Sequence, residues 1–239
     1  MIKYIPLIFP FLLIIPDVVN FVASGFVIRT SSPAISKDQW DCWTKQGLTD
    51  ALIRVYHPKG YVDAAGVANL VAWQELDEIS GNQVGYSPCL ANCQNNLTMV
   101  PDQINALVDE LKKNGIDFDV LQILIEIDPS QPWSENKTAN QQILLSAINT
   151  IANMDWNYDY QVNIISSNTS WSKIFGASFT KPSTLYSGMV NLYWIYWNGK
   201  PGLEEWTSFG GWTIPAVHEY AGNINNSPCT DAIYAIGKL

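Results

Sequence analysis

Two acidic residues at the end of an apolar run carry the strongest chemical signal in this sequence. The run is LQILIEIDPSQPW, residues 121–133, and the acids are Glu126 and Asp128. Because side chains alternate between the two faces of a β-strand, residues two positions apart are expected to point to the same side. Two carboxyl groups side by side in a cleft could perform general acid–base chemistry. The alternative is a strand that simply ends in a polar turn, because Asp-Pro is a common way to leave regular structure.

The segments around this run alternate between strand-like and helix-like patterns. Helix signals include an N-cap at Asp63 and a terminating glycine at Gly115. Strands are expected at 25–28, 51–56, 83–88, 121–127, 162–166, 190–197, 216–220 and 232–236. Helices are expected at 36–46, 63–79, 101–114 and 138–154, with a short helical turn at 171–175. No linker or repeat interrupts the pattern, which favours one domain.

This alternation predicts an α/β fold with a parallel sheet. Eight candidate strands favour a sheet closed into an irregular (β/α) barrel, similar to a TIM barrel. In such a barrel the cleft lies at the carboxyl ends of the strands. Glu126, Asp128, Tyr56, Ser166 and residues 194–197 would converge there.

The amino-terminal segment has the pattern of a secretory signal peptide. Lys3 precedes the apolar run 5–15, and Val22-Ala23-Ser24 is a suitable cleavage sequence. We therefore expect residues 1–24 to be a signal peptide and residues 25–239 to be the folded domain. An uncleaved membrane anchor is the alternative, although the run is short for a membrane span.

The charge of the chain excludes several classes of partner. Its net charge is −9 and its pI is near 4.5, so it lacks the cationic surface that binds nucleic acid or anionic lipid. No segment after the signal peptide is apolar enough to cross a bilayer, and we expect no membrane partner once the signal is cleaved. The Cys-x3-Cys spacing has no matching second pair or His, so neither a metal nor a cofactor is expected.

The chain is rich in aromatic residues, with 10 Trp and 11 Tyr. Most should pack in the core, but flat amphipathic rings also form platforms for sugar rings. The candidate sugar contacts are Tyr56, Tyr193, Trp194 and Trp212. Alternation allows only every second residue of the strand 190–197 to face the cleft. His57 and His218 are expected to be structural, although His57 follows a strand end.

Two further sets of residues fit a secreted protein. Four cysteines predict two disulfides, with three possible connectivities, and they are Cys42, Cys89, Cys93 and Cys229. Four Asn-x-Ser/Thr sequons are possible glycosylation sites on exposed loops, at Asn96, Asn136, Asn168 and Asn225.

Four segments together carry a family resemblance. They are ALIRVYHPKGYVD (51–63), the apolar strand with its two acids (121–128), VNIISSNTSWSKIFG (162–176) and SFGGWTIPAVHEYAG (208–222). Their order and spacing resemble the secreted lysozymes of glycoside hydrolase family 25, particularly the divergent branch of nematodes and amoebae. The resemblance covers nearly the whole chain after residue 24 and implies a flattened, irregular β/α barrel.

The resemblance also implies a catalytic site and shows where this chain departs from it. In that family an Asp-x-Glu pair on the central strand cleaves the β-1,4 bond next to N-acetylmuramic acid in peptidoglycan, with the Glu as general acid. Here the order is reversed to Glu126-x-Asp128, which withdraws the acid by roughly 1.5 Å, and misplacement by about 1 Å can cost on the order of a hundredfold in rate. Two other acidic positions of the family correspond here to Arg29 and Tyr234, with Asp231 as a misregistered substitute.

Two functions follow as hypotheses. The first is a secreted lysozyme-like protein with lost or weakened hydrolase activity that binds glycan or serves in innate defence against bacteria. The alternative is an active muramidase in which Glu126 donates the proton and Asp128 stabilises charge. Under both, the expected partner is bacterial cell-wall glycan or a related polysaccharide. The expected location is extracellular or the lumen of the endolysosomal pathway, and a monomer is expected.

Overall fold

The structure is a computed structural model that describes most of the chain after residue 24. The described residues are 25–30, 34–45, 48–76, 81–94, 98–116, 121–154, 161–186, 188–225, 229 and 232–238. At 25–30, 48–50, 81–82, 223–225 and 232–238 only the backbone is described. The predicted signal peptide, residues 1–24, lies outside the described residues.

Nine strands and six helices form the described part of the fold. The strands are β1 (Gly25–Thr30), β2 (Leu48–His57), β3 (Tyr61–Val62), β4 (Gly81–Tyr86), β5 (Leu121–Glu126), β6 (Val162–Ser166), β7 (Val190–Ile195), β8 (Val217–Asn225) and β9 (Ala232–Lys238). The helices are α1 (Lys37–Lys45), α2 (Ala64–Gln74), α3 (Val100–Lys113), α4 (Lys137–Ala152), α5 (Asn168–Ile174) and α6 (Lys181–Leu185).

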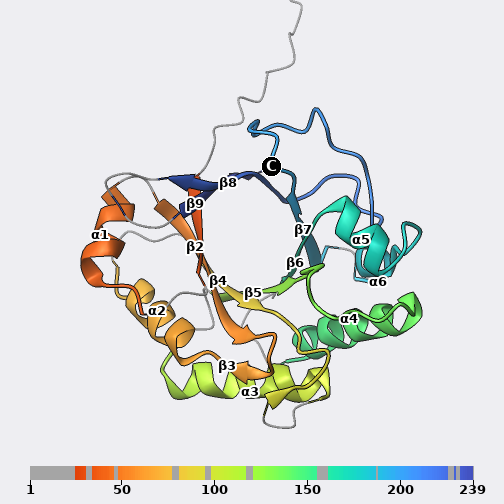
Figure 1. Ribbon diagram of the computed structural model, residues 1–239, viewed down its shortest axis with the longest axis horizontal. Helices are drawn as coiled ribbons and strands as arrows, with labels where there is room; N and C mark the ends of the chain where they lie inside the picture. Colours follow the sequence, from red (N-terminus) through yellow and green to blue (C-terminus); the bar gives the residue numbers. More distant parts are fainter. Residues whose placement is uncertain are drawn as a thin grey trace, which may run out of the picture.

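The strands form one sheet with the order β1-β9-β8-β7-β6-β5-β4-β2-β3. Strand β1 also pairs with β2, in parallel, through the register Ile28 with Ala51 and Thr30 with Ile53. The pairings among β2, β4, β5, β6, β7 and β8 are parallel, whereas β9 is antiparallel to both β8 and β1. Figure 1 shows these strands around a central axis, with the helices outside them. The predicted α/β class with a mostly parallel sheet is confirmed.

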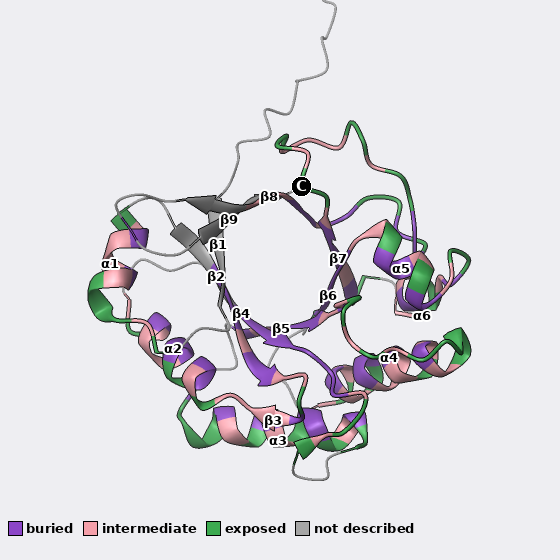
Figure 2. Cartoon of the chain, viewed as in Figure 1, coloured by how far each residue is buried: buried purple, intermediate pink, exposed green. Residues whose placement is uncertain are grey.

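Two apolar layers lie on opposite faces of the sheet. The large one lies between strands and helices and contains residues such as Ile53, Ile123 and Leu192. The small one lies on the inner face and consists of Leu52, Leu124, Ile165, Tyr193 and Val217, all buried. Figure 2 shows that the buried helix residues face the sheet. Strand alternation therefore separates an outer, helix-covered face from an inner face.

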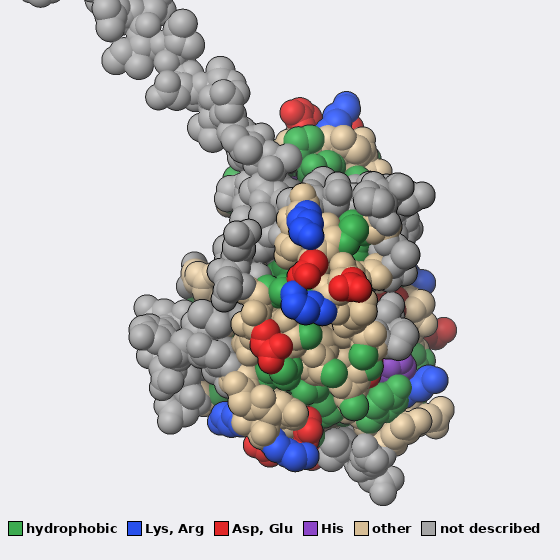
Figure 3. All heavy atoms as spheres, turned by 90° about the vertical axis from the view of Figure 1, so that its left-hand side faces the viewer, with side chains coloured by type: hydrophobic (Ala, Val, Ile, Leu, Met, Phe, Trp, Pro, Cys, Tyr) green, Lys and Arg blue, Asp and Glu red, His purple; other side chains and the backbone are tan. Residues whose placement is uncertain are grey.

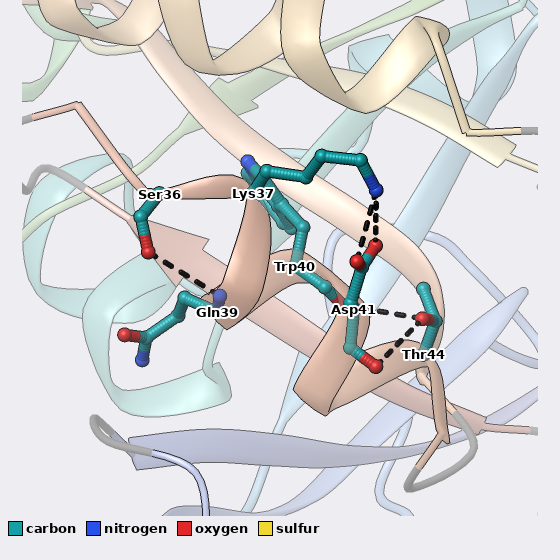
Figure 4. Close-up of polar contacts among 6 residues, drawn as sticks. All are labelled: Ser36, Lys37, Gln39, Trp40, Asp41 and Thr44. Carbon is teal, nitrogen blue, oxygen red and sulfur yellow. Dashed lines mark hydrogen bonds and ion pairs between the residues drawn. The ribbon is translucent and has the colours of Figure 1, made fainter.

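Helix α1 packs its tryptophans inward and its polar residues outward. Trp40 and Trp43 are buried and lie with ring centroids 5.3 Å apart. On the exposed side, shown in Figure 4, Ser36 Oγ accepts a hydrogen bond from the Gln39 amide at 3.3 Å, and Lys37 pairs with Asp41 at 2.9 Å. Exposed pairs of this kind contribute little, so burial of the tryptophans holds the helix in place.

Both predicted disulfides are present, and the structure selects one of the three connectivities. Cys42 of α1 is bonded to Cys229, a sequence separation of 187 residues, and Cys89 is bonded to Cys93. The first bond connects the beginning of the fold to its end. Closing so long a loop stabilises the folded state chiefly by restricting the unfolded chain.

Several local predictions are confirmed at single residues. The Asp63 side chain accepts a hydrogen bond from the Ala65 amide at 3.0 Å and is the N-cap of α2. Gly115 has φ +70° just after α3 ends, a backbone conformation that favours glycine. The aromatic strand is shorter than predicted, because β7 ends at Ile195 and leaves Tyr196 and Trp197 beyond it.

The face that carries α1 and α2 is mixed in charge (Figure 3). Figure 3 shows acidic and basic side chains near one another on the face that carries α1 and α2. Among the described residues, no helix has both the length and the apolar character required to span a membrane.

Candidate active site

Glu126 is the last residue of β5 and belongs to the inner face of the sheet. It follows Leu124 at the two-residue interval, and Leu124 is part of the inner apolar layer. The Ser87 hydroxyl, just after β4, donates a hydrogen bond to Glu126 Oε2 at 2.5 Å. The carboxyl group is half-buried, so it combines a fixed position with access from outside.

The neighbouring strand leaves space for this carboxyl group. A Cβ atom at Gly85 would lie 2.9 Å from Glu126 Oε1 and 3.2 Å from Arg54 Cα. Glycine inside a strand often marks the close approach of another group. Here it lets the Glu126 carboxyl group lie against the backbone of β4.

Arg54 brings a positive charge to the same region. It lies on β2 in register with Gly85, two residues after the inward Leu52. Its Nε atom is buried and has no hydrogen-bond partner among the described residues. A buried N–H of this kind is costly unless a partner is supplied, and a bound ligand oxygen could supply it.

The Asp128 carboxylate has different hydrogen-bond partners from the Glu126 carboxyl group. Its Oδ1 accepts a hydrogen bond from the Ser130 amide at 2.8 Å, and its backbone carbonyl accepts one from Trp133 Nε1 at 2.9 Å. This is an Asx turn, the polar strand end that the sequence offered as the alternative. One oxygen of the Asp128 carboxylate is therefore engaged with its own turn, whereas Glu126 is hydrogen-bonded to Ser87, just after the adjacent strand β4.

A third acid, Glu219, was missed at the sequence level. It lies on β8 in register with Ile195 and is only 2% exposed. Its Oε1 accepts a hydrogen bond from Trp197 Nε1 at 2.9 Å. The signal that could have found it is alternation, because Glu219 lies two residues after Val217 and so faces the interior.

The four aromatic residues predicted to contact sugar are all buried. Tyr56 is 0%, Trp194 3%, Trp212 7% and Tyr193 9% exposed. Tyr56 lies against Tyr86, and Trp212 packs on Trp171 and donates its indole N–H to the Val190 carbonyl. Tyr193 faces inward and its hydroxyl accepts a hydrogen bond from Gln83 Nε2 at 2.7 Å. The exposed aromatic residues near the site are instead Tyr196 and Trp197, at 44% and 50%.

The two histidines occupy different environments. His57 Nδ1 accepts a hydrogen bond from the Lys59 amide, and its ring stacks on Tyr61 at 4.8 Å. Burial, followed by the positive charges of Arg54 and Lys59, lowers the pKa of His57. His218 is fully buried on Trp194, with both ring nitrogens 2.9 Å from carbonyl oxygens, those of Gly202 and Tyr196. These contacts fit the structural roles expected.

A pocket of about 510 Å³ opens at the carboxyl ends of β6 and β7. Its walls carry hydroxyl, amide, carboxylate and aromatic groups, from Ser167, Asn168, Thr169, Ser172, Trp194, Ile195, Tyr196, Glu205 and Thr207. A hydrogen bond to Glu205 and the charge of that carboxylate raise the pKa of Tyr196, which keeps its hydroxyl protonated. Glu126 pairs with Ile165 of β6, so the pocket and the acid lie at the same edge of the sheet.

Several predicted positions are only partly described. The backbones of Arg29 and Tyr234 lie in β1 and β9, but their side chains are outside the described residues, as are Asn96 and the side chain of Asn225. Asn136 is exposed as the N-cap of α4, and Asn168 begins α5 at the pocket. Within the described ranges, no three His, Cys, Asp or Glu side chains gather as a metal site would require.

Comparison with known proteins identifies similar chains. A family model described as lysozyme-like protein 1 matches residues 23–220. Lysozyme-like protein 5 of Caenorhabditis elegans is 25% identical over 220 residues, which cover 91% of this chain and 92% of that protein. A probable GH family 25 lysozyme 4 of Dictyostelium discoideum is 27% identical over 222 residues, covering 92% and 93%.

A solved structure has a similar fold. It is a family 25 glycosyl hydrolase from Bacillus anthracis, with a TM-score of 0.59 and 10% sequence identity over 90% of this chain and 87% of that one. At this identity the likeness shows the fold alone. Together these matches confirm the family resemblance that the sequence predicted.

Proposed function

Because the chain belongs to the lysozyme-like protein 1 family, we propose that it is a secreted protein that binds bacterial cell-wall glycan and hydrolyses it weakly. The binding region is the edge of the sheet where β4 to β8 end. It combines the acids Glu126 and Glu219, the cation Arg54 and the polar pocket beside β7. Alternating polar groups and exposed aromatic rings suit a ligand with many hydroxyl groups and apolar ring faces.

The proposal that hydrolysis is weak rests on one observation, the hydrogen bond from the Ser130 amide to the Asp128 carboxylate. The family resemblance assigns the general acid to this position. An aspartate is one methylene shorter than a glutamate, and here it also caps its own turn. A proton donor must lie within hydrogen-bond reach of the leaving oxygen, and a donor displaced by about 1 Å can cost on the order of a hundredfold in rate.

The alternative is an active muramidase in which Glu126 donates the proton. The observation in its favour is the contact between Ser87 and Glu126 at 2.5 Å, which holds an inward carboxyl group in a half-buried position. Glycoside hydrolysis usually uses two carboxyl groups, and Asp128 or Glu219 would be the second.

The fold proposed for this function is an irregular (β/α) barrel. Its support is that β1 pairs with both β2 and β9, so the pairings return to the strand where they began. Parallel barrels place their active sites at the carboxyl ends of the strands, the edge where Glu126 lies.

Secretion and a role in innate defence are part of the proposal. Two disulfides support an oxidising compartment, because such bonds persist mainly outside the cytosol. The signal-like sequence 1–24 and the exposed sequon at Asn136 agree with this. A monomer and an extracellular or endolysosomal location remain predictions.

The experiment measures binding and hydrolysis on the same peptidoglycan with the wild type, Glu126→Gln and Asp128→Asn. We expect the wild type to sediment with insoluble peptidoglycan, to release reducing ends slowly, and to keep its binding in Asp128→Asn. Rapid release that is abolished by Glu126→Gln would support the active muramidase instead. Absence of both binding and release would contradict both functions.

A further inference from the structure

Trp197 differs from the tryptophans around it because its ring is exposed. It lies two residues beyond the end of β7, and 50% of its surface is accessible, compared with 3% for Trp194 within β7. Isolated exposed apolar residues are common. Trp197 is unusual because its ring is also held at its edge and on one face.

The edge of the ring is held by a buried carboxylate. The indole N–H of Trp197 donates to Glu219 Oε1 at 2.9 Å, and Glu219 is 2% exposed. A hydrogen bond shielded from water is electrostatically stronger than one in solvent. The contact therefore fixes the direction in which the indole points.

One face of the ring lies directly on the backbone of β8. A Cβ atom at Gly222 would be 2.3 Å from Trp197 Cζ2 and 2.5 Å from Cε2, distances that no side chain permits. Glycine at this position allows the ring to lie flat on the strand. Trp197 nevertheless keeps 50% of its surface accessible.

We propose that Trp197 is a preoriented stacking platform for one pyranose ring of the glycan, with Glu219 and Gly222 as positioning residues. The inference rests on the proposed function and adds the subsite that binds the sugar. A ring held before binding loses little conformational entropy when the ligand arrives. Glu219 is in register with Ile195 at the end of β7, so the platform stands at the edge of the sheet that carries Glu126.

The surroundings favour a carbohydrate over an apolar protein segment. The residues next to Trp197 along the chain are Tyr196, whose ring stacks on Trp194, and Asn198, whose side chain accepts a hydrogen bond from the Lys200 amide. The polar pocket begins at Tyr196. A flat ring bordered by polar groups matches the apolar face and equatorial hydroxyls of a sugar.

The test measures the affinity of the full chain for N-acetylglucosamine tetrasaccharide and for soluble peptidoglycan strands by calorimetry. Trp197→Ala is expected to weaken binding by about tenfold or more, because an aromatic stacking contact and its buried area are lost. Gly222→Ala is expected to weaken binding to a similar extent although Trp197 is retained, because the new methyl group lifts the ring. Glu219→Leu removes the acceptor of the indole N–H and is expected to weaken binding by about threefold or more, because the direction of the Trp197 ring is no longer fixed.

The matched control is Leu185→Ala. Leu185 is also exposed, at 66%, but it ends α6, which precedes β7 and so lies towards the opposite edge of the sheet. The affinity of the Leu185→Ala variant for both glycans should equal that of the wild type. Thermal unfolding midpoints close to the wild-type value would exclude a loss of structure as the cause of weaker binding.

The outcomes separate the platform from the proposed function. If the wild type binds either glycan and both Trp197→Ala and Gly222→Ala bind equally well, the platform is wrong while the proposed function stands. If the wild type binds neither glycan nor insoluble peptidoglycan, the proposed function fails and the platform fails with it.

Discussion

The outer and inner faces of the sheet are built from the same strands but differ in chemistry. On the outer face, alternate residues of β5, β6 and β7 are almost all apolar and buried, among them Ile123, Ile164 and Leu192. On the inner face, the same strands carry amides at one end and an acid at the other. Gln122, Asn163 and Asn191 form a chain of side-chain hydrogen bonds at 3.0 and 3.3 Å, and Glu126 lies towards the carboxyl end of the sheet.

This difference separates stability from function. Buried polar groups cost free energy unless they are hydrogen-bonded, and the amides of Gln122, Asn163 and Asn191 meet this cost with one another. Two buried atoms of the inner face lack a partner among the described residues: Gln83 Oε1 and, at the carboxyl end, Arg54 Nε. Departures from good local packing are expected at functional sites. We therefore expect substitutions on the outer face to change stability and substitutions at the carboxyl end of the inner face to change glycan chemistry.

The largest effect on stability is expected from Trp171→Ala on the outer side. Trp171 is fully buried, packs on Phe175 and Trp212, and donates its indole N–H to the Phe179 carbonyl at 3.1 Å. We expect a loss of about 3–5 kcal/mol in the free energy of unfolding, measured by urea denaturation. A loss below about 1 kcal/mol would contradict the outer face as the main source of stability.

Gly85→Ala tests the inner face with a single methyl group. The new Cβ would approach Glu126 Oε1 to 2.9 Å, and the flexible carboxyl group must move away. We expect residual hydrolysis of peptidoglycan to fall about tenfold or more, because small displacements of reacting groups are costly. The unfolding midpoint is measured in parallel, because the new Cβ would also lie 3.2 Å from Arg54 Cα. Unchanged hydrolysis would show that the position of the Glu126 carboxyl group is unimportant.

Two tyrosines on neighbouring strands form a matched pair for a smaller effect. Burial raises the pKa of Tyr56 to about 12 and that of Tyr86 well above its ordinary value. The Tyr86 hydroxyl donates to Gln103 Oε1 at 2.9 Å, whereas the Tyr56 hydroxyl has no partner among the described residues. Tyr86→Phe should therefore cost about 1 kcal/mol and Tyr56→Phe should be neutral or stabilising. Equal losses in urea denaturation would show that Tyr56 has a partner.

The smallest effect concerns His57 and pH. Its pKa is lowered in the folded state, first by burial and then by the charges of Arg54 and Lys59. The unfolded chain therefore binds a proton more readily, and stability should decrease as the pH falls below about 6.5, the ordinary pKa of histidine. His57→Gln should reduce this slope in denaturation curves collected between pH 7.5 and 5. A slope identical to the wild type would exclude His57 as its source.

The sequence predicted the outer face better than the inner one. Apolar periodicity and caps such as Asp63 and Gly115 depend on local chemistry, and they gave the order and type of most elements. Helix α6 and the two-residue β3 were missed because so few residues give no periodic signal. Tyr56 was expected in the cleft, but the register of β2 shifts between Arg54 and Tyr56, and its ring lies in the outer layer.

The sequence predicted that Glu126 ends an apolar strand, and Glu126 is the last residue of β5, whereas its role in a catalytic site stays a prediction. Glu126 was found from the apolar run that it ends. The turn at Asp128 could be recognised from Asp-Pro, but the sequence could not decide between a turn and a second catalytic acid. Glu219 was missed because its partner, Trp197, is 22 residues away and the hydrogen bond between them depends on strand pairing.

The most direct test of the central claim is the initial rate of reducing-end release from peptidoglycan, measured beside an active family 25 muramidase at equal concentration. The same preparation is assayed for sedimentation with the insoluble glycan. The Asp128 carboxyl group reaches less far into the site than a glutamate at this position would. We therefore expect the protein to bind the glycan but to cleave it on the order of a hundredfold more slowly than the active enzyme. A rate comparable to that of the active enzyme would contradict the claim.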